Sequence, residues 1–382
     1  MRDLSTKFKD LFGKSPSVIS TAPGRINLIG EHTDYNLGYV LPAAIDRRIY
    51  FLAAPRNDEK VKLWADNFGK MEEFALRDLS PSSENIWANY VKGIFWVLEK
   101  EGHSLGGVDG FIFGDIPLGS GLSSSAALEV SVTNALNVLF KLSLPVERIP
   151  QIAQKSENEY VGVECGLMDQ FISVFGRRGQ ALFLDCETYV YEYIPLPLKN
   201  NGVQFIVVDS RVRRELSSSE YNTRRRECQA VVNLLKEEGV ESLRDVPLRL
   251  LEDSRDRVGD LLFRRARHVI TENERVVDSV HALKSYDFIR LGELLLASHR
   301  SLRDDYEVSC PELDLLYSLG EEYGGCLGAR LTGAGFGGSG IALIENECVR
   351  GFQETIEEAF AFRGFKPPQI LEIDIGEGAV VR

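Results

Sequence analysis

Three hydroxyl side chains in a row follow a glycine-rich turn in the stretch PLGSGLSSSAALEV. Gly119 and Gly121 lack a Cβ atom, so a ligand can approach the backbone closely there. Ser123, Ser124 and Ser125 stand where a helix would begin, and a helix start offers unpaired N–H groups and a positive dipole end that suit a phosphate. One serine would suffice to cap the helix, whereas three favour a phosphate loop with a hydroxyl to spare for Mg²⁺. The stretch is not a Walker A loop, because no Lys-Ser or Lys-Thr pair closes it.

A second stretch, APGRINLIGEHTDYNLGYVLP, combines charged and polar side chains with glycines within residues 22–42. It is too polar for a core strand and too interrupted by turn residues for a solvated helix. Such a loop offers a fixed cation with several hydrogen-bond donors and acceptors, which is what a polyhydroxylated ligand requires. The residues that carry this expectation are Arg25, Glu31, His32, Asp34 and Tyr35.

A third stretch, LTGAGFGGSG at residues 331–340, places four glycines within six residues between two apolar runs. A loop of this composition can pack close to another backbone or to a phosphate. Taken by itself, this stretch is better explained as a tight β turn than as a ligand-binding loop. Its assignment to a site therefore depends on the other two stretches.

The elements that must position these loops are a mixture of strands and helices. Short apolar runs between turn residues predict strands over 18–66, in VDGFIFGD, in GQALFLD and in VQFIVVDS. Helices are expected over 85–102, after Ser125, in PVERIPQIAQKSENEYVG, and as long charged helices from Glu215 to about Tyr323. GARLTG, GIALIEN and QILEIDI predict further strands, with a helix from about Cys348.

The order of these elements predicts an α+β fold in two domains. The chain has 382 residues, and single cores stop growing at roughly 250 to 300 residues. Strands and helices alternate without a βαβα rhythm, which disfavours a doubly wound parallel sheet. Proline and glycine cluster in YIPLPLKNNG between two apolar runs, so we place the boundary there, giving domains 1–195 and 196–382.

Charge and cysteine content restrict the partners and the compartment. Lys and Arg total 44 against 57 Asp and Glu, and the net charge of −13 argues against binding to nucleic acid or an anionic membrane. The six cysteines are scattered without metal-type spacing, as expected of reduced thiols in a cytoplasmic protein. The first residues show an amphipathic pattern at Leu4, Phe8, Leu11 and Phe12, which predicts a docked helix. No signal-type core follows it, and no run of about 18 apolar residues occurs, so we expect neither export nor a membrane span.

Together, the three stretches resemble motifs of the galactokinases, a family within the GHMP small-molecule kinase superfamily. GRINLIGEHTDYN is similar to the galactokinase signature, PLGSGLSSSA to the superfamily's phosphate loop, and LTGAGFGG to its third motif. WANYVKG, GLMDQF, SSSEYNTRRREC and SHRSLRDDYEVSCPELD also resemble galactokinase segments, so the similarity runs nearly from end to end. Ser120 and Ala334 stand where many relatives carry glycine, and Ala334 would be strained at a positive φ.

The resemblance implies a two-domain α+β GHMP kinase fold with the active site in the cleft between the N- and C-terminal domains. It implies transfer of the γ-phosphoryl group of MgATP to the anomeric hydroxyl of α-D-galactose, giving α-D-galactose 1-phosphate and ADP. The implied substrates are D-galactose and ATP, with Mg²⁺ as the metal ion and a cytoplasmic location. A monomer is slightly favoured over an oligomer.

The resemblance also assigns roles to residues. Asp169 is a lone carboxylate in the mostly apolar run CGLMDQF, which is costly unless the charge is paired or used. It would accept the proton of the anomeric hydroxyl, while Arg25 would keep it ionised and offset charge in the transition state. The family's sugar-contacting positions correspond to Glu31, His32, Asp34, Gly166, Asp169 and Tyr221.

The implied nucleotide contacts are the phosphate-loop residues Gly119, Gly121, Ser123, Ser124 and Ser125 and, beside the base, Trp87 and Tyr90. Ser125 and Glu157 would hold the metal ion. Without the family, Trp87 and Tyr90 are a packing pair at helical spacing, and Glu157 is a surface carboxylate on a charged helix.

Two other functions fit parts of the sequence. A kinase for a related sugar, such as N-acetylgalactosamine or L-arabinose, would differ mainly in the room beside the sugar loop. A galactose sensor without catalytic activity could lose the phosphate loop or the catalytic pair, whereas GLSSSA, Arg25 and Asp169 are all intact. The basic run Arg224, Arg225 and Arg226 is interpreted as helix-face partners of glutamates rather than as an anion site.

Overall fold

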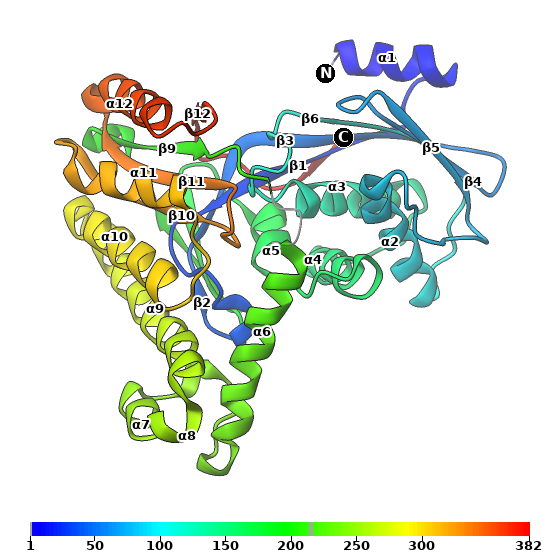
Figure 1. The fold of residues 1–382 in the computed structure, drawn as a ribbon. Helices are drawn as coiled ribbons and strands as arrows, with labels where there is room; N and C mark the ends of the chain where they lie inside the picture. Colours follow the sequence, from blue (N-terminus) through cyan, green and yellow to red (C-terminus); the bar gives the residue numbers. More distant parts are fainter. Residues whose placement is uncertain (1, 214–216) are drawn as a thin grey trace.

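The computed structural model describes residues 2–213 and 217–382 (Figure 1). Its largest sheet contains β1 (Val18–Asn27), β3 (Pro42–Pro55), β4 (Lys60–Ala65), β5 (Lys70–Ala75), β6 (Val108–Gly114) and β13 (Val380–Val381). The strand order is β13-β1-β3-β6-β4-β5, and all neighbours are antiparallel except β4 and β6. The strands expected over 18–66 and in VDGFIFGD are confirmed.

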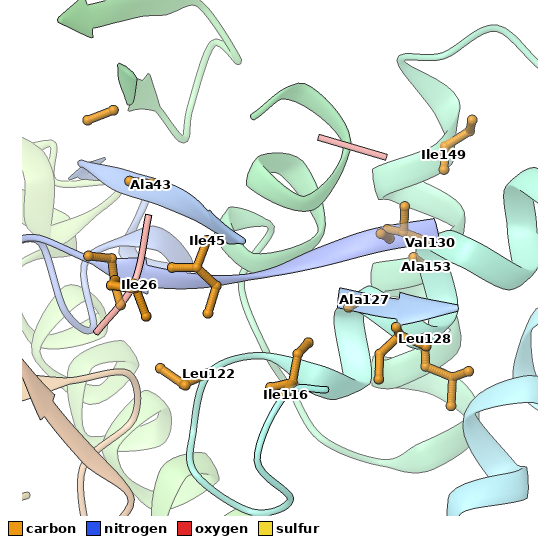
Figure 2. Close-up of a cluster of buried hydrophobic side chains, with 14 of the residues drawn as sticks. Ile26, Ala43, Ile45, Ile116, Leu122, Ala127, Leu128, Val130, Ile149 and Ala153 are labelled. Carbon is orange, nitrogen blue, oxygen red and sulfur yellow. The ribbon is translucent and has the colours of Figure 1, made fainter. Parts of the chain in front are cut away.

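Helices cover both faces of this sheet because its strands alternate apolar side chains to each side. The helices α3 (Ser124–Leu139) and α5 (Met168–Phe175) pack on one face, and α2 (Ile86–Lys100) and α4 (Arg148–Lys155) pack against α3. Figure 2 shows this core, in which Ile26 and Ile45 of the strands and Val130 of α3 lie among the buried side chains.

The opposite face of the sheet holds the N-terminal helix α1 (Arg2–Phe12). Leu4 and Phe8 pack on Leu52 and Phe111, which alternate with the inward-facing residues of β3 and β6. The docked helix is therefore confirmed, although Leu11, assigned to its buried face, is 37% exposed.

A second sheet contains β9 (Val203–Asp209), β10 (Cys326–Thr332), β11 (Ser339–Glu345) and β12 (Gln369–Glu372), in the antiparallel order β10-β11-β9-β12. The helices α11 (Pro311–Glu322) and α12 (Val349–Phe362) pack on one face. The helix α10 (Phe288–Asp304) packs on the other, where its leucines join Val207 and Ile341. These elements match the strands and the late helix expected from the sequence.

A third, three-stranded sheet and a helical lobe complete the described chain. The sheet has the order β2-β7-β8, formed by β2 (Tyr39–Val40), β7 (Gln180–Asp185) and β8 (Tyr191–Pro195). The lobe, at the bottom of Figure 1, contains α6 (Ser217–Leu234), α7 (Leu248–Asp253), α8 (Arg255–Val258) and α9 (Asp260–Lys284) around its own apolar cluster. Arg244 ties the lobe to β7, donating to Asp185 at 2.8 Å.

Short turns connect these elements, and two of them carry site residues. These two are the 3-10 turn η1 (Asp34–Asn36) and the π-helical turn η2 (Ser156–Val161). The others are η3 (Lys199–Asn201), η4 (Lys236–Glu238), η5 (Leu243–Asp245) and η6 (Asn346–Cys348). The helix expected in PVERIPQIAQKSENEYVG therefore stops being regular at Ser156, and π-helical turns of this kind are frequent at functional sites.

The division of the chain at residue 195 stays a prediction. β8 ends at Pro195 in one sheet, and β9 begins at Val203 in another. The last strand nevertheless returns to the first sheet, where Val380 and Val381 pair with β1. Within residues 2–213 and 217–382, no helix is long and apolar enough to cross a bilayer.

Candidate active site

A cavity of about 550 Å³ lies where the first sheet, α3, α5 and the β10–β11 loop meet. Every residue to which the resemblance assigns a role lines it, although the positions span nearly 200 residues of sequence, whereas Tyr35 of the second stretch does not line it. The residues with an assigned role are Arg25, Glu31, His32, Asp34, Trp87, Tyr90, Gly119, Gly121, Ser123, Ser124, Ser125, Glu157, Gly166, Asp169 and Tyr221. Their proximity is a structural fact, and their individual roles stay predictions.

Arg25 and Asp169 form a two-pronged ion pair in this cavity. Nε and Nη2 of Arg25 donate to the two carboxylate oxygens of Asp169 at 2.8 and 2.9 Å, and Nη1 donates to the carbonyl of Gly121 at 2.7 Å. Arg25 is 4% exposed, whereas the side chain of Asp169 is 28% exposed. The pair therefore fixes the carboxylate's orientation while leaving it open to a ligand.

The backbone of β1 is shaped to deliver Arg25. The pairing of β1 with β3 shifts register between Pro23 and Arg25, and a bulge of this kind turns a side chain to a new direction. A Cβ on Gly24 would lie 2.6 Å from the carbonyl oxygen of Leu122, so only glycine allows this approach. The N–H of Arg25 then donates to that carbonyl at 3.1 Å, which joins β1 to the phosphate loop.

Ser123 does not cap α3. It adopts a left-handed conformation with φ 59°, makes no capping bond, and instead donates its hydroxyl to Asp169. A serine in this region is uncommon and has an energetic cost, so the local structure must hold it there. The capped-helix alternative is therefore wrong for this serine, which contacts the carboxylate assigned as the base.

Glu31 lies at the back of the cavity and is 1% exposed. Its carboxylate accepts from Asn27 Nδ2 and from the backbone N–H of Gly333, both at 2.8 Å, and pairs with the buried Arg330. Burial raises the pKa of Glu31 to about 7, against the opposing charge of Arg330. The carboxylate thus links the sugar loop to the third glycine-rich stretch, in addition to facing the cavity.

His32 is anchored by a series of hydrogen-bond contacts. Nε2 lies 3.1 Å from the carbonyl of Ala334, which can only accept, so Nε2 carries a hydrogen, and Nδ1 lies 2.8 Å from the Tyr35 hydroxyl. The Tyr35 hydroxyl lies 2.8 Å from that of Tyr306, which in turn lies 3.1 Å from the Cys228 thiol. The series anchors His32 to the helical lobe.

Asp34, Gly166 and Tyr221 form the wall of the cavity beside the Arg25–Asp169 ion pair. A Cβ on Gly166 would lie 2.0 Å from Asp34 Oδ2, so Gly166 makes room for that carboxylate. Burial, followed by the charge of Asp169, raises the pKa of Asp34 to about 6. The centroid of the Tyr221 ring lies 5.4 Å from that of His32 and 5.2 Å from that of Tyr35.

Glu157 reaches the cavity from the π-helical turn η2 and is 7% exposed, so it is not the surface carboxylate of the alternative interpretation. Burial, with the charge of Asp169 second, raises the pKa of Glu157 to about 7, and a hydrogen bond from Ser125 lowers it. Gln170 donates to the carboxylate at 2.8 Å. The structure thus brings together the two residues predicted to hold a metal ion.

The third glycine-rich stretch packs against backbone. A Cβ on Gly335 would lie 2.2 Å from the carbonyl oxygen of Val308, and one on Gly333 would lie 3.0 Å from that of Gly121. Ala334 is not among the residues with positive φ, so its departure from glycine causes no strain there. Ser120 is also accommodated in place of glycine, since its hydroxyl donates to the carbonyl of Pro117 at 2.7 Å.

Among the cavity residues that were not predicted from the sequence, Arg213 and Phe68 have side chains that suit a ligand. Arg213 lies beside the phosphate loop, held by two 3.0 Å bonds to Asp209 and donating to the Gly119 carbonyl at 3.2 Å. Phe68 lines the end near Trp87. The sequence did contain a signal for Arg213, because it belongs to a basic run directly after the strand VQFIVVDS. Phe68 lies in a turn without a motif, so the sequence contained no signal for it.

The basic run at 224–226 pairs with glutamates, as expected, and also with backbone carbonyls. Arg224 donates to Glu227 at 3.3 Å and to the carbonyls of Tyr306 and Glu307 at 2.7 and 3.0 Å. Nε of Arg225 lies 3.8 Å from the carboxylate of Glu164, and Nη1 donates to the carbonyl of that residue at 2.7 Å. These arginines tie α6 to neighbouring segments.

Family models match three parts of the chain. Residues 6–55 match the galactokinase galactose-binding signature, residues 89–177 the N-terminal domain of GHMP kinases, and residues 279–354 the C-terminal domain of GHMP kinases.

Curated relatives match over nearly the whole chain. A galactokinase of Roseiflexus sp. (strain RS-1) is 43% identical, covering 94% of this chain and 91% of the relative. A galactokinase of Staphylococcus carnosus (strain TM300) is 41% identical, covering 99% of this chain and 98% of the relative. The crystal structure of Lactococcus lactis galactokinase complexed with galactose superimposes with a TM-score of 0.94 at 39% identity, covering 99% of both chains. Mevalonate kinase of Methanococcus jannaschii, at 17% identity and a TM-score of 0.65, shares the fold alone.

Proposed function

We propose a specific sugar kinase reaction for this chain, which belongs to the galactokinase family. The γ-phosphoryl group of ATP is transferred to the anomeric hydroxyl of α-D-galactose, and the products are α-D-galactose 1-phosphate and ADP. The observation that carries this proposal is the convergence of Asp169, Arg25 and the phosphate loop on one cavity.

Asp169 accepts the proton of the anomeric hydroxyl as the bond to phosphorus forms. Its two bonds to Arg25 hold the carboxylate in place, and its exposed side receives the sugar. Ser123 adds a third contact that restricts the carboxylate. Positioning of this kind matters because phosphoryl transfer depends mainly on alignment and on stabilisation of charge.

Arg25 and the start of α3 stabilise the transferred group. Arg25 lies between Asp169 and the carbonyl of Gly121, so its charge faces the region where the γ-phosphoryl group must pass. Gly119, Gly121 and the serines at the N-terminus of α3 hold the phosphates, with Arg213 as a further cation beside them.

The sugar is recognised by charged and polar groups in the wall of the cavity. Its hydroxyls form hydrogen bonds with the carboxylates of Asp34 and Glu31 and with polar groups beside His32. Gly166 and Tyr221 lie next to these groups. An epimer leaves such buried groups unpaired, so glucose is a poor substrate.

The kinase requires a divalent metal ion, and we propose Mg²⁺ held by Ser125 and Glu157. A hydroxyl and a carboxylate are ligands of the type that Mg²⁺ takes from proteins. The fit is supported by Glu157 itself, because burial raises its pKa to about 7 and a bound cation would offset that effect. The ion neutralises phosphate charge when bound.

The test is phosphorylation of a panel of sugars by the purified chain with ATP and Mg²⁺. We expect ADP release with galactose and little with glucose, and the product identified by ³¹P and ¹H NMR should be α-D-galactose 1-phosphate. Faster turnover of N-acetylgalactosamine or L-arabinose would identify a kinase for a related sugar. Galactose binding without turnover would identify a sensor.

The cytoplasmic location and the monomeric state stay predictions from the sequence. All six cysteines are free in the structure, which agrees with a reducing compartment.

A further inference from the structure

A buried arginine stands directly behind the loop between β1 and β2, which carries the sugar-site residues. Arg330 lies on β10 in the second sheet and is 0% exposed. Its Nη1 donates to the carbonyl of Leu28 at 2.7 Å, and its Nη2 donates to a carboxylate oxygen of Glu31. Because Leu28 follows β1 of the first sheet, the guanidinium of Arg330 joins the second sheet to the start of this loop.

The charge of Arg330 is compensated within a buried cluster. Glu31 is one partner, and Glu272 of α9 is another, with Oε1 lying 3.9 Å from Nη2 of Arg330. Glu272 also accepts from Arg275 Nε at 2.7 Å, so two cations and two carboxylates face one another here. A buried charge that loses such a partner is costly, which ties the side chains of the cluster to fixed positions.

The helix α9 also holds the backbone of the loop. Oε1 of Glu272 accepts from the N–H of Gly30 at 3.0 Å, and Nε2 of His268 lies 3.1 Å from the carbonyl of Glu31. His268 and Glu272 are four residues apart, so they lie on one side of the helix. The backbone at Gly30 and Glu31 is therefore fixed by α9, and the direction of the Glu31 side chain depends on its own partners.

The carboxylate of Glu31 has one acceptor position left for a ligand. A carboxylate offers about four such positions. Among the residues that the structure describes, Asn27, Gly333 and Arg330 donate to three of them. Glu31 lines the cavity, where the remaining position can receive a hydrogen bond from a sugar. An ionised carboxylate can only accept, so it selects a hydroxyl that donates.

Arg330 is the group that keeps this carboxylate an acceptor. Burial raises the pKa of Glu31 to about 7, and the charge of Arg330 is the largest influence that opposes the rise. The other two donors, Asn27 and the N–H of Gly333, carry no charge and cannot replace it. Without Arg330, the buried carboxyl would take up a proton and its hydroxyl would become a donor.

We propose that Arg330 is a positioning residue for sugar recognition, which acts through Glu31 and fixes the hydrogen-bond preference at one hydroxyl of the sugar. This rests on the function proposed above, in which galactose is the acceptor substrate. Arg330 is 0% exposed and is not among the residues that line the cavity, so its effect on the sugar is indirect. Its removal should therefore weaken recognition of one hydroxyl and leave the other hydroxyls and ATP unaffected.

The test compares the binding of galactose and of its 2-, 3-, 4- and 6-deoxy derivatives to the full chain, by calorimetry without nucleotide. The deoxy sugar that lacks the donor to Glu31 should bind at least about tenfold more weakly than galactose, as expected for a hydrogen bond to a charged group. In Arg330→Gln this preference should fall below about threefold. The preferences at the other three positions, and KM for ATP, should stay within about twofold. Arg330→Lys keeps the charge and should keep the preference.

A double-mutant cycle tests whether Arg330 acts through Glu31. Glu31→Gln should abolish the preference at one hydroxyl and so identify its position, and adding Arg330→Gln should cause no further change. The double variant removes one positive and one negative charge, so its comparison with Glu31→Gln decides the question even if Arg330→Gln alone does not fold. Arg265→Gln is the matched control, because Arg265 is 2% exposed and pairs with Glu227 and Glu307 away from the cavity. It should lower Tm and leave every sugar preference unchanged.

Three results would overturn the proposal. One is an equal weakening of galactose and all four deoxy sugars in Arg330→Gln, which would show a purely structural role. The others are an unchanged preference in that variant and a further loss when Arg330→Gln is added to Glu31→Gln. Because binding is measured without ATP, these results do not depend on turnover. Absent phosphorylation with a preference in binding that depends on Arg330 would refute only the proposed reaction.

Discussion

Asp169→Asn changes one oxygen of the carboxylate that we propose as the base and almost nothing of its shape. In the wild type, both oxygens accept from Arg25, at 2.8 and 2.9 Å. The amide can accept at only one position, and its NH₂ group faces a donor at the other. The variant therefore removes the base and half of the ion pair while keeping the packing of α5.

The structure allows the loss of turnover and the loss of stability in this variant to be estimated. Loss of a general base lowers kcat by about 10²- to 10⁴-fold. Arg25, which is 4% exposed, loses one of its two bonds to the partly exposed Asp169, and removing one member of a buried ion pair costs about 3 kcal/mol at the lower end of its range. The 28% exposure of Asp169 favours that lower end. We therefore expect a fall of a few degrees in Tm and a much larger relative loss of turnover.

The assay measures ADP release, galactose affinity and Tm for the variant and for a matched control. Asp109→Asn is the control, because Asp109 also pairs with cations, Arg56 at 2.6 Å and Lys14 at 2.8 Å, but lies outside the cavity. It should lower Tm similarly and leave kcat unchanged. Galactose affinity in Asp169→Asn should fall by less than about tenfold, since the rest of the sugar loop is intact. Turnover near the wild-type value in Asp169→Asn would refute the assignment of the base.

Further predictions concern the sugar loop and the N-terminal helix. Burial raises the pKa of Asp34 to about 6. A hydrogen bond from a sugar hydroxyl favours the ionised carboxylate and lowers this pKa. Galactose binding near pH 6 should therefore release protons. Calorimetry in two buffers of different ionisation enthalpy measures this, and identical heats would contradict it. Gly166→Ala places a Cβ 2.0 Å from Asp34 and should raise KM for galactose at least tenfold without affecting KM for ATP; an unchanged galactose KM would show that Asp34 can move freely. Tyr306→Phe removes the hydroxyl that is hydrogen-bonded to Tyr35 and should raise KM for galactose a few-fold with kcat unchanged; equal effects on both substrates would indicate a general loss of structure. Phe8→Ala should lower the free energy of unfolding by about 3 kcal/mol with normal kcat, as urea titration would show; a change below 1 kcal/mol would contradict the packing of α1.

Motif chemistry predicted the composition of the cavity because each motif carries its own local signal. The glycines and serines before α3 indicate a helix start open to a ligand, and Arg25 and Asp34 stand in a stretch too polar for a core. Asp169 also had a local signal, as a lone carboxylate in a mostly apolar run. Glu157 had none, so its assignment depended on the resemblance, and the structure places both residues in the cavity.

Other features depend on tertiary contacts that no local pattern encodes. Ser123 is a favourable capping residue, yet its contact with Asp169, 46 positions away, determines its conformation. The helix after residue 148 changes to a π turn at Ser156, and the short strand β13 pairs with β1 across the whole chain. Phe68 was missed because a single aromatic in a turn is indistinguishable in sequence from an ordinary exposed residue.

The most direct measurement is a crystal structure of the chain with galactose and a non-hydrolysable ATP analogue. We expect the anomeric oxygen of the sugar within hydrogen-bond distance of the Asp169 carboxylate, in line with the γ-phosphorus and with Arg25 beside both. An anomeric oxygen that faces away from Asp169, with another hydroxyl next to the γ-phosphorus, would contradict both the proposed base and the proposed product.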